Sequence, residues 1–259
     1  MARDASRDPP AGRSRTLRSP RGCTIDESDI RFRIAAARRI LYREGCDSQT
    51  AGHVSARATG ENAFWVTPFQ YFDETLPEHV IKVSFDLEVL EGDWVASPAI
   101  EFHAALYRAR ADVGAVVHHH ARYTALVSST GEVVRPYNLL AYLFYDDQGM
   151  IFDDDTGGAT EGERIVRSIG DKSVLLMHNH GCVVVGPTLE VAAVKSVLLE
   201  HAARYHIEAV QAGGKELHDE DRVRRYQAAL GQYMVPEMWA AHTRRLRKSD
   251  PELFEWLGR

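Results

Sequence analysis

Ala115-Val-Val-His-His-His120 starts as an apolar, β-branched run and ends in three histidines. Val174-Leu-Leu-Met-His-Asn-His180 repeats this order later in the chain, where two more histidines follow an apolar run. Short apolar runs of this kind are typical of buried strands. We therefore expect two buried β-strands that each end in histidine side chains.

The spacing of these histidines indicates a metal site. Successive side chains of a strand point to opposite faces, so His118 and His120 share a face while His119 points away. Residues two apart on a strand lie roughly 6.5–7 Å apart at Cα, and their imidazoles can reach one ion at about 2.0–2.1 Å each. His178 and His180 form a second pair of this kind. Converging neutral imidazoles bind divalent transition metals such as Zn, Fe, Mn or Co.

Two interpretations without a metal remain open. A single buried histidine is most often a hydrogen-bonded core residue, and runs of histidine also occur on solvated surfaces. Here five of the 12 histidines lie at two strand ends, behind apolar residues. This arrangement favours the metal site.

The rest of the chain alternates helices with short strands. Helices are predicted over residues 27–44, after a capping pair of Thr24 and Glu27, and over 188–212. Pro98 opens another helix that runs to about Arg110. The remaining short strands are predicted around residues 53–56, 64–67, 80–85, 89–90 and 182–185. Interleaved helices and strands predict an α/β or α+β fold of packed layers.

Composition and charge exclude several classes of protein. The 259 residues are 44% hydrophobic and 26% charged, as in ordinary globular proteins, and no apolar run is long enough for a membrane span. The net charge of −6 argues against a general nucleic-acid binder. The three cysteines are scattered and form no disulfide framework or Cys-x-x-Cys site, which favours a reducing cytoplasm.

Residues 1–23 differ from the rest of the chain. They contain six arginines and three prolines but hardly any apolar side chain, so they cannot bury enough surface to offset the entropy of ordering. We predict a disordered basic tail at 1–23 and a single domain with C-terminal helices at 24–259. The tail lacks the apolar segment of a signal peptide, and its acidic residues argue against a transit peptide.

Three motifs occur together: Gly52-His-Val-Ser-Ala-Arg57, Tyr107-Arg-Ala-Arg-Ala-Asp-Val-Gly-Ala-Val-Val-His-His-His120 and His178-Asn-His-Gly181. In this order they resemble the class II aldolase/adducin family over roughly residues 28–214. The resemblance implies an α/β fold, a three-layer α/β/α sandwich. It also implies a homo-oligomer, often a tetramer, with active sites between subunits, to which the C-terminal helices of a neighbour can contribute. Packing of these helices within their own subunit is the alternative.

The resemblance also implies one divalent metal, Zn, Fe or Mn, and assigns its ligands. Carried over residue by residue, the ligands are His118, His120 and His180. His178 precedes the last ligand by two positions and becomes either a partner of the ligands or a fourth ligand.

The sequence departs from the family at its acid/base residue. The sugar-phosphate aldolases of the family usually carry Ser-Ser-Glu before a helix histidine that corresponds to His103, with the glutamate four residues before it. That position is Ala99 here, and the nearby glutamate is Glu101. Two residues are a rotation of about 200° on a helix, so Glu101 points elsewhere unless Pro98 shifts the register. Glu101 either lines the site or lies in the first helical turn, where the helix dipole favours a carboxylate.

The phosphate-binding positions are altered as well. The aldolases tend to have Gly-Asn and Thr-Pro-x-Gly where this chain has Gly52-His53 and Thr67-Pro68-Phe69. The small residues that let a backbone cradle phosphate are replaced, so we infer a substrate without phosphate. Aromatic residues cluster at 64–72 and 137–152. They belong either to the core and interfaces or to a flat apolar pocket beside the metal.

These considerations define the remaining candidate residues. The candidate catalytic residues, each able to give or take a proton, are Glu101, His103 and Tyr145. The candidate substrate-binding residues, most of them within the motifs, are His53, Ser55, Arg57, Phe69 and His178. Possible carboxylate clamps, with solvated positions as the alternative, are Arg57, Arg122 and Lys195.

The predicted chemistry is cleavage of a C–C bond, in which a metal polarises a substrate oxygen and stabilises the enolate that forms. We expect a decarboxylase or aldolase-type lyase that acts on a non-phosphorylated, aromatic hydroxy- or oxo-carboxylic acid. One alternative is a mononuclear non-haem Fe(II) oxygenase that oxidatively decarboxylates an aryl 2-oxo or 2-hydroxy acid, as enzymes of aminocoumarin biosynthesis resembling this family do. The others are a sugar-phosphate aldolase and a non-enzymatic, adducin-like binding module.

Overall fold

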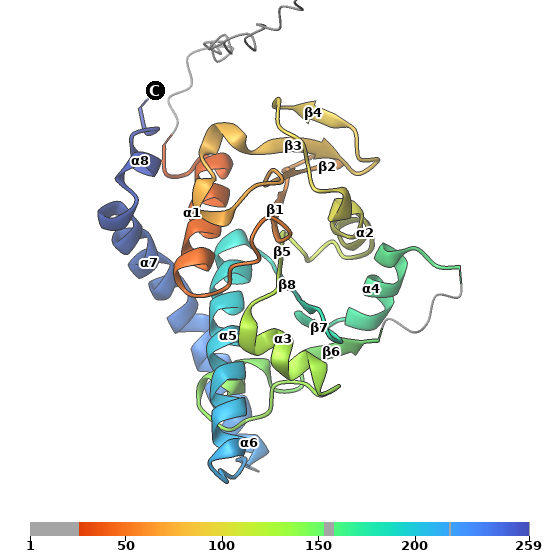
Figure 1. Cartoon of the computed structure of the whole chain (residues 1–259), viewed down its shortest axis with the longest axis vertical. Coiled ribbons are helices and arrows are strands. Elements are labelled where there is room, and N and C mark those ends of the chain that lie inside the picture. The colour runs from red at the N-terminus through yellow and green to blue at the C-terminus, as the bar shows by residue number, and fades with distance from the viewer. Residues whose placement is uncertain (1–25, 153–157, 218, 259) are drawn as a thin grey trace, which may run out of the picture.

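The computed structural model describes residues 26–152, 158–217 and 219–258, in which one eight-stranded sheet lies between two layers of helices (Figure 1). This confirms the predicted three-layer α/β/α sandwich. The strands are β1 (His53–Arg57), β2 (Ala63–Val66), β3 (Ile81–Ser84), β4 (Val89–Glu91), β5 (Ala115–His119), β6 (Gln148–Ile151), β7 (Val174–Met177) and β8 (Gly181–Gly186). The helices are α1 (Ile30–Arg43), α2 (Glu101–Ala109), α3 (Arg122–Ser129), α4 (Glu161–Ile169), α5 (Leu189–Gln211), α6 (Glu220–Ala229), α7 (Val235–Ser249) and α8 (Pro251–Phe254). The predicted tail at 1–23 and Thr24 lie outside the described residues.

The order of the strands puts β5 in the middle of the sheet. The order is β4-β3-β2-β1-β5-β8-β7-β6, and every neighbouring pair is antiparallel except β6 and β7. Because β5 runs antiparallel to both β1 and β8, its last residues lie beside the first residues of those two strands. His118 is therefore opposite His53 on one side, and His119 is opposite Cys182 on the other.

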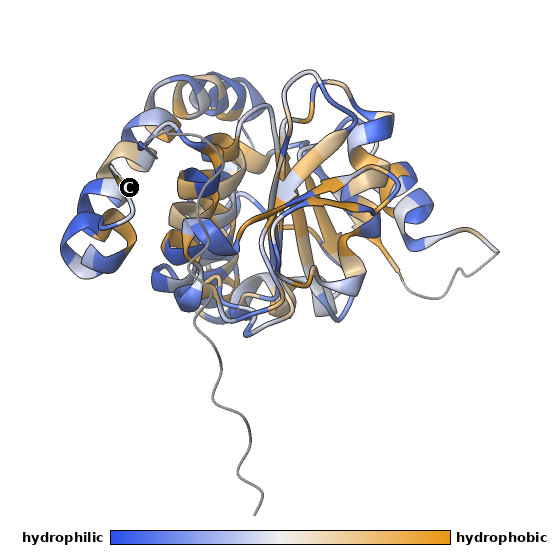
Figure 2. Ribbon diagram, turned by 90° about the horizontal axis from the view of Figure 1, so that it is seen from above, coloured by the Kyte–Doolittle hydropathy of each residue, from blue (hydrophilic) through white to orange (hydrophobic). Residues whose placement is uncertain are grey.

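The two faces of β5 belong to different layers. Val117 packs into a core under α1 and α5, whereas Val116 packs into a core under α2 and α4. Figure 2 shows the apolar residues of the sheet between these layers. Strand alternation then places His118 on the α2/α4 face and His119 on the α5 face, so the two point to opposite faces, as the sequence predicts.

Local capping explains where the helices begin. Asp29 accepts a hydrogen bond from the backbone N–H of Arg31, so α1 starts at Ile30 rather than at residue 27. Ser97 caps a short 3-10 turn, Pro98–Ile100, through the N–H of Ala99. That turn delays the start of α2 to Glu101, three residues after the predicted start at Pro98.

The predicted strand over residues 174–180 ends early. β7 stops at Met177, and His178–His180 form a tight turn into β8, in which the N–H of His180 donates to the carbonyl of Met177 at 3.0 Å. Asn179 adopts the left-handed conformation, with φ of 56°. The expectation that His178 and His180 share a strand face is therefore wrong, because alternation does not hold in a turn.

None of the helices in the described ranges combines the length and apolarity that crossing a membrane would require.

Candidate metal centre

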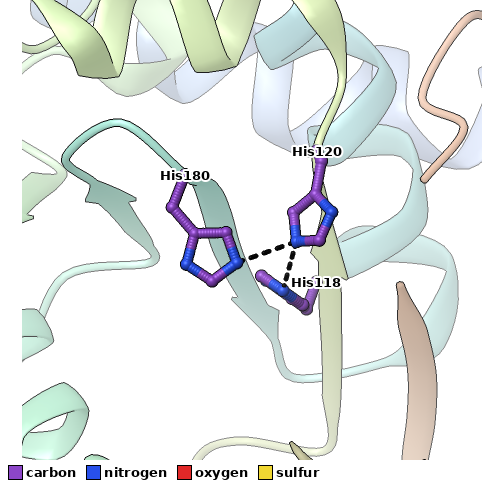
Figure 3. Close-up of side chains that lie close together, drawn as sticks. All are labelled: His118, His120 and His180. Carbon is purple, nitrogen blue, oxygen red and sulfur yellow. Dashed lines mark hydrogen bonds between the residues drawn. The ribbon is translucent and has the colours of Figure 1, made fainter. Parts of the chain in front are cut away.

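Three histidines from two adjoining segments bring their side-chain nitrogens together (Figure 3). His118 comes from β5, His120 from the link after β5, and His180 from the turn before β8. The Nε2 atom of His120 lies 2.9 Å from Nε2 of His118 and 2.9 Å from Nε2 of His180. All three ligand atoms lie within 4.8 Å of one another. The antiparallel pairing of β5 with β8 explains this convergence, because it sets the end of one strand beside the start of the other.

The protonation of these rings fits a bound cation. Nδ1 of His118 lies 2.9 Å from the carbonyl oxygen of Cys182. A carbonyl only accepts, so Nδ1 carries the proton and Nε2 of the neutral ring keeps its lone pair. Burial lowers the pKa of His118 well below its usual value, and burial together with His180 lowers the pKa of His120 to about 4. The Nε2 atoms of His118 and His120 lie beside Nε2 of His180, and an ion with bonds of about 2.0–2.1 Å could bind to all three.

Gly181 lets the two segments approach closely. A Cβ atom at this position would overlap the carbonyl oxygen of His119 and would lie 2.9 Å from Cδ2 of His120. Glycine is required here because of this close contact, whereas the neighbouring Asn179 carries the unusual backbone angle of the turn.

His53 lies directly beside His118, as the pairing of β1 with β5 dictates. Their ring centroids are 5.4 Å apart, and Nε2 of His53 is 2.8 Å from Oγ of Ser97. Nδ1 of His53 is buried and has no hydrogen-bond partner among the described residues. A buried polar atom of this kind is commonly satisfied by a ligand or a water.

His103 and Ser55 form a buried chain behind His53. Oγ of Ser55 lies 2.7 Å from Nδ1 of His103 and 2.7 Å from the hydroxyl of Tyr107. Burial lowers the pKa of His103 well below its usual value and raises the pKa of Tyr107. His103 and Ser55 are as buried as His53, and Nε2 of His103 also lacks a hydrogen-bond partner among the described residues.

A small hollow adjoins the third histidine. His180 lines it together with His178, whose ring packs on Phe152 at 4.9 Å between centroids. The other residues around it, which come from β6, β7 and α4, are Ile151, Glu161, Arg164, Ile165 and Met177. Larger hollows, of about 660 and 540 Å³, lie between α1 and α7 and at the far end of β1, away from the histidines.

Glu101 lies outside the histidine cluster. Its carboxylate accepts hydrogen bonds from the N–H of Gly162 at 2.9 Å and from the hydroxyl of Thr160 at 3.4 Å. These groups begin α4, whose first N–H groups need acceptors. In this chain the Glu101 carboxylate therefore caps a neighbouring helix, and its predicted catalytic role stays a prediction.

We expect Glu101→Gln to leave catalysis within about threefold of the wild type. The amide oxygen can still accept from Gly162, and only the charge at the helix N-terminus is lost, which costs about 0.3–1 kcal/mol. Thermal unfolding should shift by a few degrees at most. If this variant turned over substrate about two orders of magnitude more slowly at unchanged stability, Glu101 would be restored as an acid/base.

Two other candidates lie at the opposite end of the sheet from the histidines. The Arg57 guanidinium donates to the carbonyls of Tyr107, Val113 and Arg110, which fixes a loop at the far end of β1. Tyr145 precedes β6, and its carbonyl accepts from Gln227. Within the described residues of one chain, neither Arg57 nor Tyr145 lies beside the histidines, so their roles in substrate binding and catalysis stay predictions.

The remaining candidates are placed as follows. Phe69 is 51% exposed in the loop after β2, at the end of the sheet where His53 lies. Lys195 Nζ donates to Asp147, just before β6, and to Ser173, just before β7. Arg122 is exposed at the start of α3.

Sequence reasoning missed the residues around the hollow and the partner of His53. Phe152 directly follows β6, and the parallel pairing of β6 with β7 carries it beside His178. Arg164 comes from α4, which the sequence pattern did not locate. The Ser97-Pro98 pair, typical of a helix start, was the available signal for Ser97.

The sequence was compared with protein-family models and with known proteins. Residues 32–207 match the sequence model of the Class II Aldolase and Adducin N-terminal domain. The chain is 33% identical over 195 residues to the 4-hydroxy-3-prenylphenylpyruvate oxygenase/4-hydroxy-3-prenylbenzoate synthase of Streptomyces roseochromogenus subsp. oscitans, which covers 72% of this chain and 70% of that protein. It is 33% identical to the decarboxylase NovR of Streptomyces niveus, which covers 72% of each chain.

A solved structure is similar to this chain over most of the three-layer fold. An aldolase II superfamily protein from Pseudomonas syringae superimposes with a TM-score of 0.77 at 25% identity, over 86% of this chain and 93% of that one. Since the family model spans most of the chain and the fold agrees, the chain belongs to the class II aldolase/adducin family.

Proposed function

We propose that this chain is a divalent-metal-dependent lyase that cleaves a C–C bond in a non-phosphorylated, aromatic hydroxy- or oxo-carboxylic acid, by decarboxylation or retro-aldol cleavage. The observation that carries the proposal is the convergence of three imidazoles beside a small hollow, of about 20 Å³, that aromatic, apolar and charged side chains line. A binding module without activity would have no use for such a cluster, which argues against the adducin-like alternative.

The relatives support an aromatic acid as the substrate class. One is named for a prenylphenylpyruvate and a prenylbenzoate, and another is named a decarboxylase. Phe152 and His178 offer a stacking surface next to His180, in a hollow that Glu161 and Arg164 also line. The position of a phosphate-binding asparagine is taken by His53, which is buried and engaged with Ser97. These features disfavour a sugar phosphate.

A metal held by His118, His120 and His180 would supply a Lewis acid for a substrate oxygen and stabilise the negative charge left by the breaking bond. The chain's own groups do the rest. The Cys182 carbonyl fixes the ring of His118 through Nδ1. We assign His53 to the substrate, because its free Nδ1 can hydrogen-bond an oxygen beside His118 while Ser97 holds the other ring nitrogen. The buried chain of His103, Ser55 and Tyr107 supports the position of His53.

A second candidate function is oxidative decarboxylation by a mononuclear Fe(II) oxygenase. The word oxygenase in the name of a relative that is 33% identical favours it. The same three histidines would hold the iron, and the aryl acid would bind beside them, on the side of the same hollow.

One pair of assays separates these functions. The protein is purified without oxygen, its metal is identified, and an aryl 2-oxo acid such as 4-hydroxyphenylpyruvate and an aryl 2-hydroxy acid such as mandelate are supplied as probes. CO2 release in the absence of oxygen supports the lyase, whereas CO2 release that requires stoichiometric oxygen uptake supports the oxygenase. Efficient cleavage of a sugar phosphate, with no turnover of either acid, would overturn both.

We expect Phe152→Ala to raise KM for the aryl acid about tenfold, equivalent to about 1.4 kcal/mol, with kcat changed less than threefold. The reason is that the substitution removes a stacking surface without touching the histidines. Tyr205→Ala, an exposed aromatic on α5, is the matched control and should change neither constant. Unchanged KM in Phe152→Ala would place the substrate elsewhere.

We also propose that the chain forms a homo-oligomer, a tetramer, in the cytoplasm. Within the described residues, Cys46 and Cys182 are free and buried, which suits a reducing compartment. Light scattering on a size-exclusion column tests the tetramer directly.

A further inference from the structure

His120 is held differently from the other two histidines. His118 is part of the sheet, and its ring is fixed by the bond to the Cys182 carbonyl. His120 lies just beyond β5, in the two-residue link to α3, and the polar contacts given for its ring within the described structure are with the other two imidazoles. The direction of this ring therefore depends on the backbone of the link.

A buried carboxylate fixes the far end of the link. Oε1 of Glu200, on α5, accepts from the N–H of Tyr123 at 2.9 Å. Oε2 accepts from the N–H of Thr124 at 2.8 Å and from its hydroxyl at 2.7 Å. The helix's own cap residue, Ala121, has no side chain that could accept these bonds. Glu200 thus caps α3 from another helix, and it is only 6% exposed.

Two single hydrogen bonds fix the end of the link that lies next to β5. The N–H of His120 donates to Oγ of Ser48 at 2.6 Å, and the N–H of Ala121 donates to Nδ1 of His119 at 3.2 Å. Hydrogen bonds therefore hold the backbone at both ends of the link that carries the ring of His120.

We propose that Glu200 is a positioning residue for His120. By tying the first turn of α3 to α5, it holds the imidazole toward His118 and His180 and so sets the affinity and geometry of the metal site. This inference rests on the proposed function, because it requires the three histidines to bind a metal. Glu200 acts through the backbone, since its hydrogen bonds go to Tyr123 and Thr124 and not to the imidazoles.

The substitution Glu200→Gln is the direct test. It keeps the size of the side chain and one acceptor oxygen, but it loses the second acceptor and the charge that favours a helix N-terminus. Losing an outer partner of a metal ligand typically weakens metal binding 10–100-fold. We expect a loss in this range when the metal-free full-length protein is titrated with cobalt(II), together with an altered visible spectrum of the bound cobalt.

Two further variants support the interpretation of this titration. Ser48→Ala removes only the acceptor for the His120 N–H and should weaken cobalt binding in the same direction. Glu190→Gln is the matched control on α5, where it loses an ion pair with Arg33 about 15 Å along the helix from Glu200. It should bind cobalt within twofold of the wild type. Circular dichroism establishes that each variant is folded.

A double-mutant cycle separates positioning from a general effect. In a His120→Ala background, where weak binding is followed at millimolar cobalt, Glu200→Gln should change the affinity less than twofold. An equal loss in both backgrounds would overturn the inference, because a direct electrostatic or global effect does not need His120. Wild-type affinity in Glu200→Gln would overturn it as well. If the wild-type protein binds no cobalt, the proposed function fails instead.

Discussion

Replacing His180 by alanine should remove the metal and lower kcat/KM by about 10³-fold or more, while the fold is kept. A Lewis acid contributes several kcal/mol to such a reaction, and about 4 kcal/mol corresponds to a thousandfold in rate. His180 suits this test better than His118, because it lies exposed in a turn and leaves no cavity in the core. Elemental analysis of this variant should find less than about a tenth of an ion per chain. The variant and the wild type, both without metal, should have the same melting temperature.

His178→Ala is the matched control for this experiment. It lies in the same turn, but its ring packs on Phe152 instead of facing the other imidazoles. We expect this variant to keep its metal and to lose affinity for the substrate. Full metal content in His180→Ala, or its loss in His178→Ala alone, would contradict the ligand assignment.

Replacing Asp250 by alanine should cost about 3–5 kcal/mol of unfolding free energy, because it leaves the buried Arg39 without its buried partner. Arg39 and Asp250 are both 4% exposed in their side chains and lie 3.0 Å apart, and Arg43 bonds to the same carboxylate. These bonds tie the junction of α7 and α8 to α1. We expect the melting temperature to fall by roughly 10 °C, measured at matched protein concentration.

Glu252→Ala provides the comparison. Its carboxylate pairs with the same arginine but is 52% exposed, so its loss should cost less than about 1 kcal/mol. Equal effects of the two substitutions would contradict the assignment of Asp250 as the buried anchor. The expected difference also bears on the C-terminal helices. Leu246 and Leu253 are buried against the chain's own core, so packing within the subunit is a role these helices already fill.

The elements that the sequence predicted well are those that local geometry determines. Apolar runs and helical periodicity located α1, α5 and most strands to within a few residues, because burial of one face imposes those patterns. Alternation along β5 placed His118 and His119 on opposite faces for the same reason. The motifs pointed to the family, and the family model confirms it.

The sequence could not place polar side chains whose partners are distant in the sequence. The spacing of Glu101 from His103 was readable, but the free N–H groups of α4 that Glu101 caps come from residues about 60 positions away. The sequence suggested that Arg57 binds a substrate carboxylate, but its guanidinium donates hydrogen bonds to backbone carbonyls in the 107–113 segment. Hydrophobic periodicity does not predict such a contact. A long polar side chain bonds to a group that only the packing of the layers brings near it.

The sequence by itself determined that two buried strands of a layered α/β domain end in histidines, because hydrophobic patterns depend only on residues close together in the chain. The family resemblance named His180 as the third ligand, but only the tertiary structure decided how its ring meets His118 and His120 while His178 packs on Phe152. That arrangement depends on the turn at Asn179 and on the antiparallel pairing of β5 with β8, which bring together backbone some 60 residues apart.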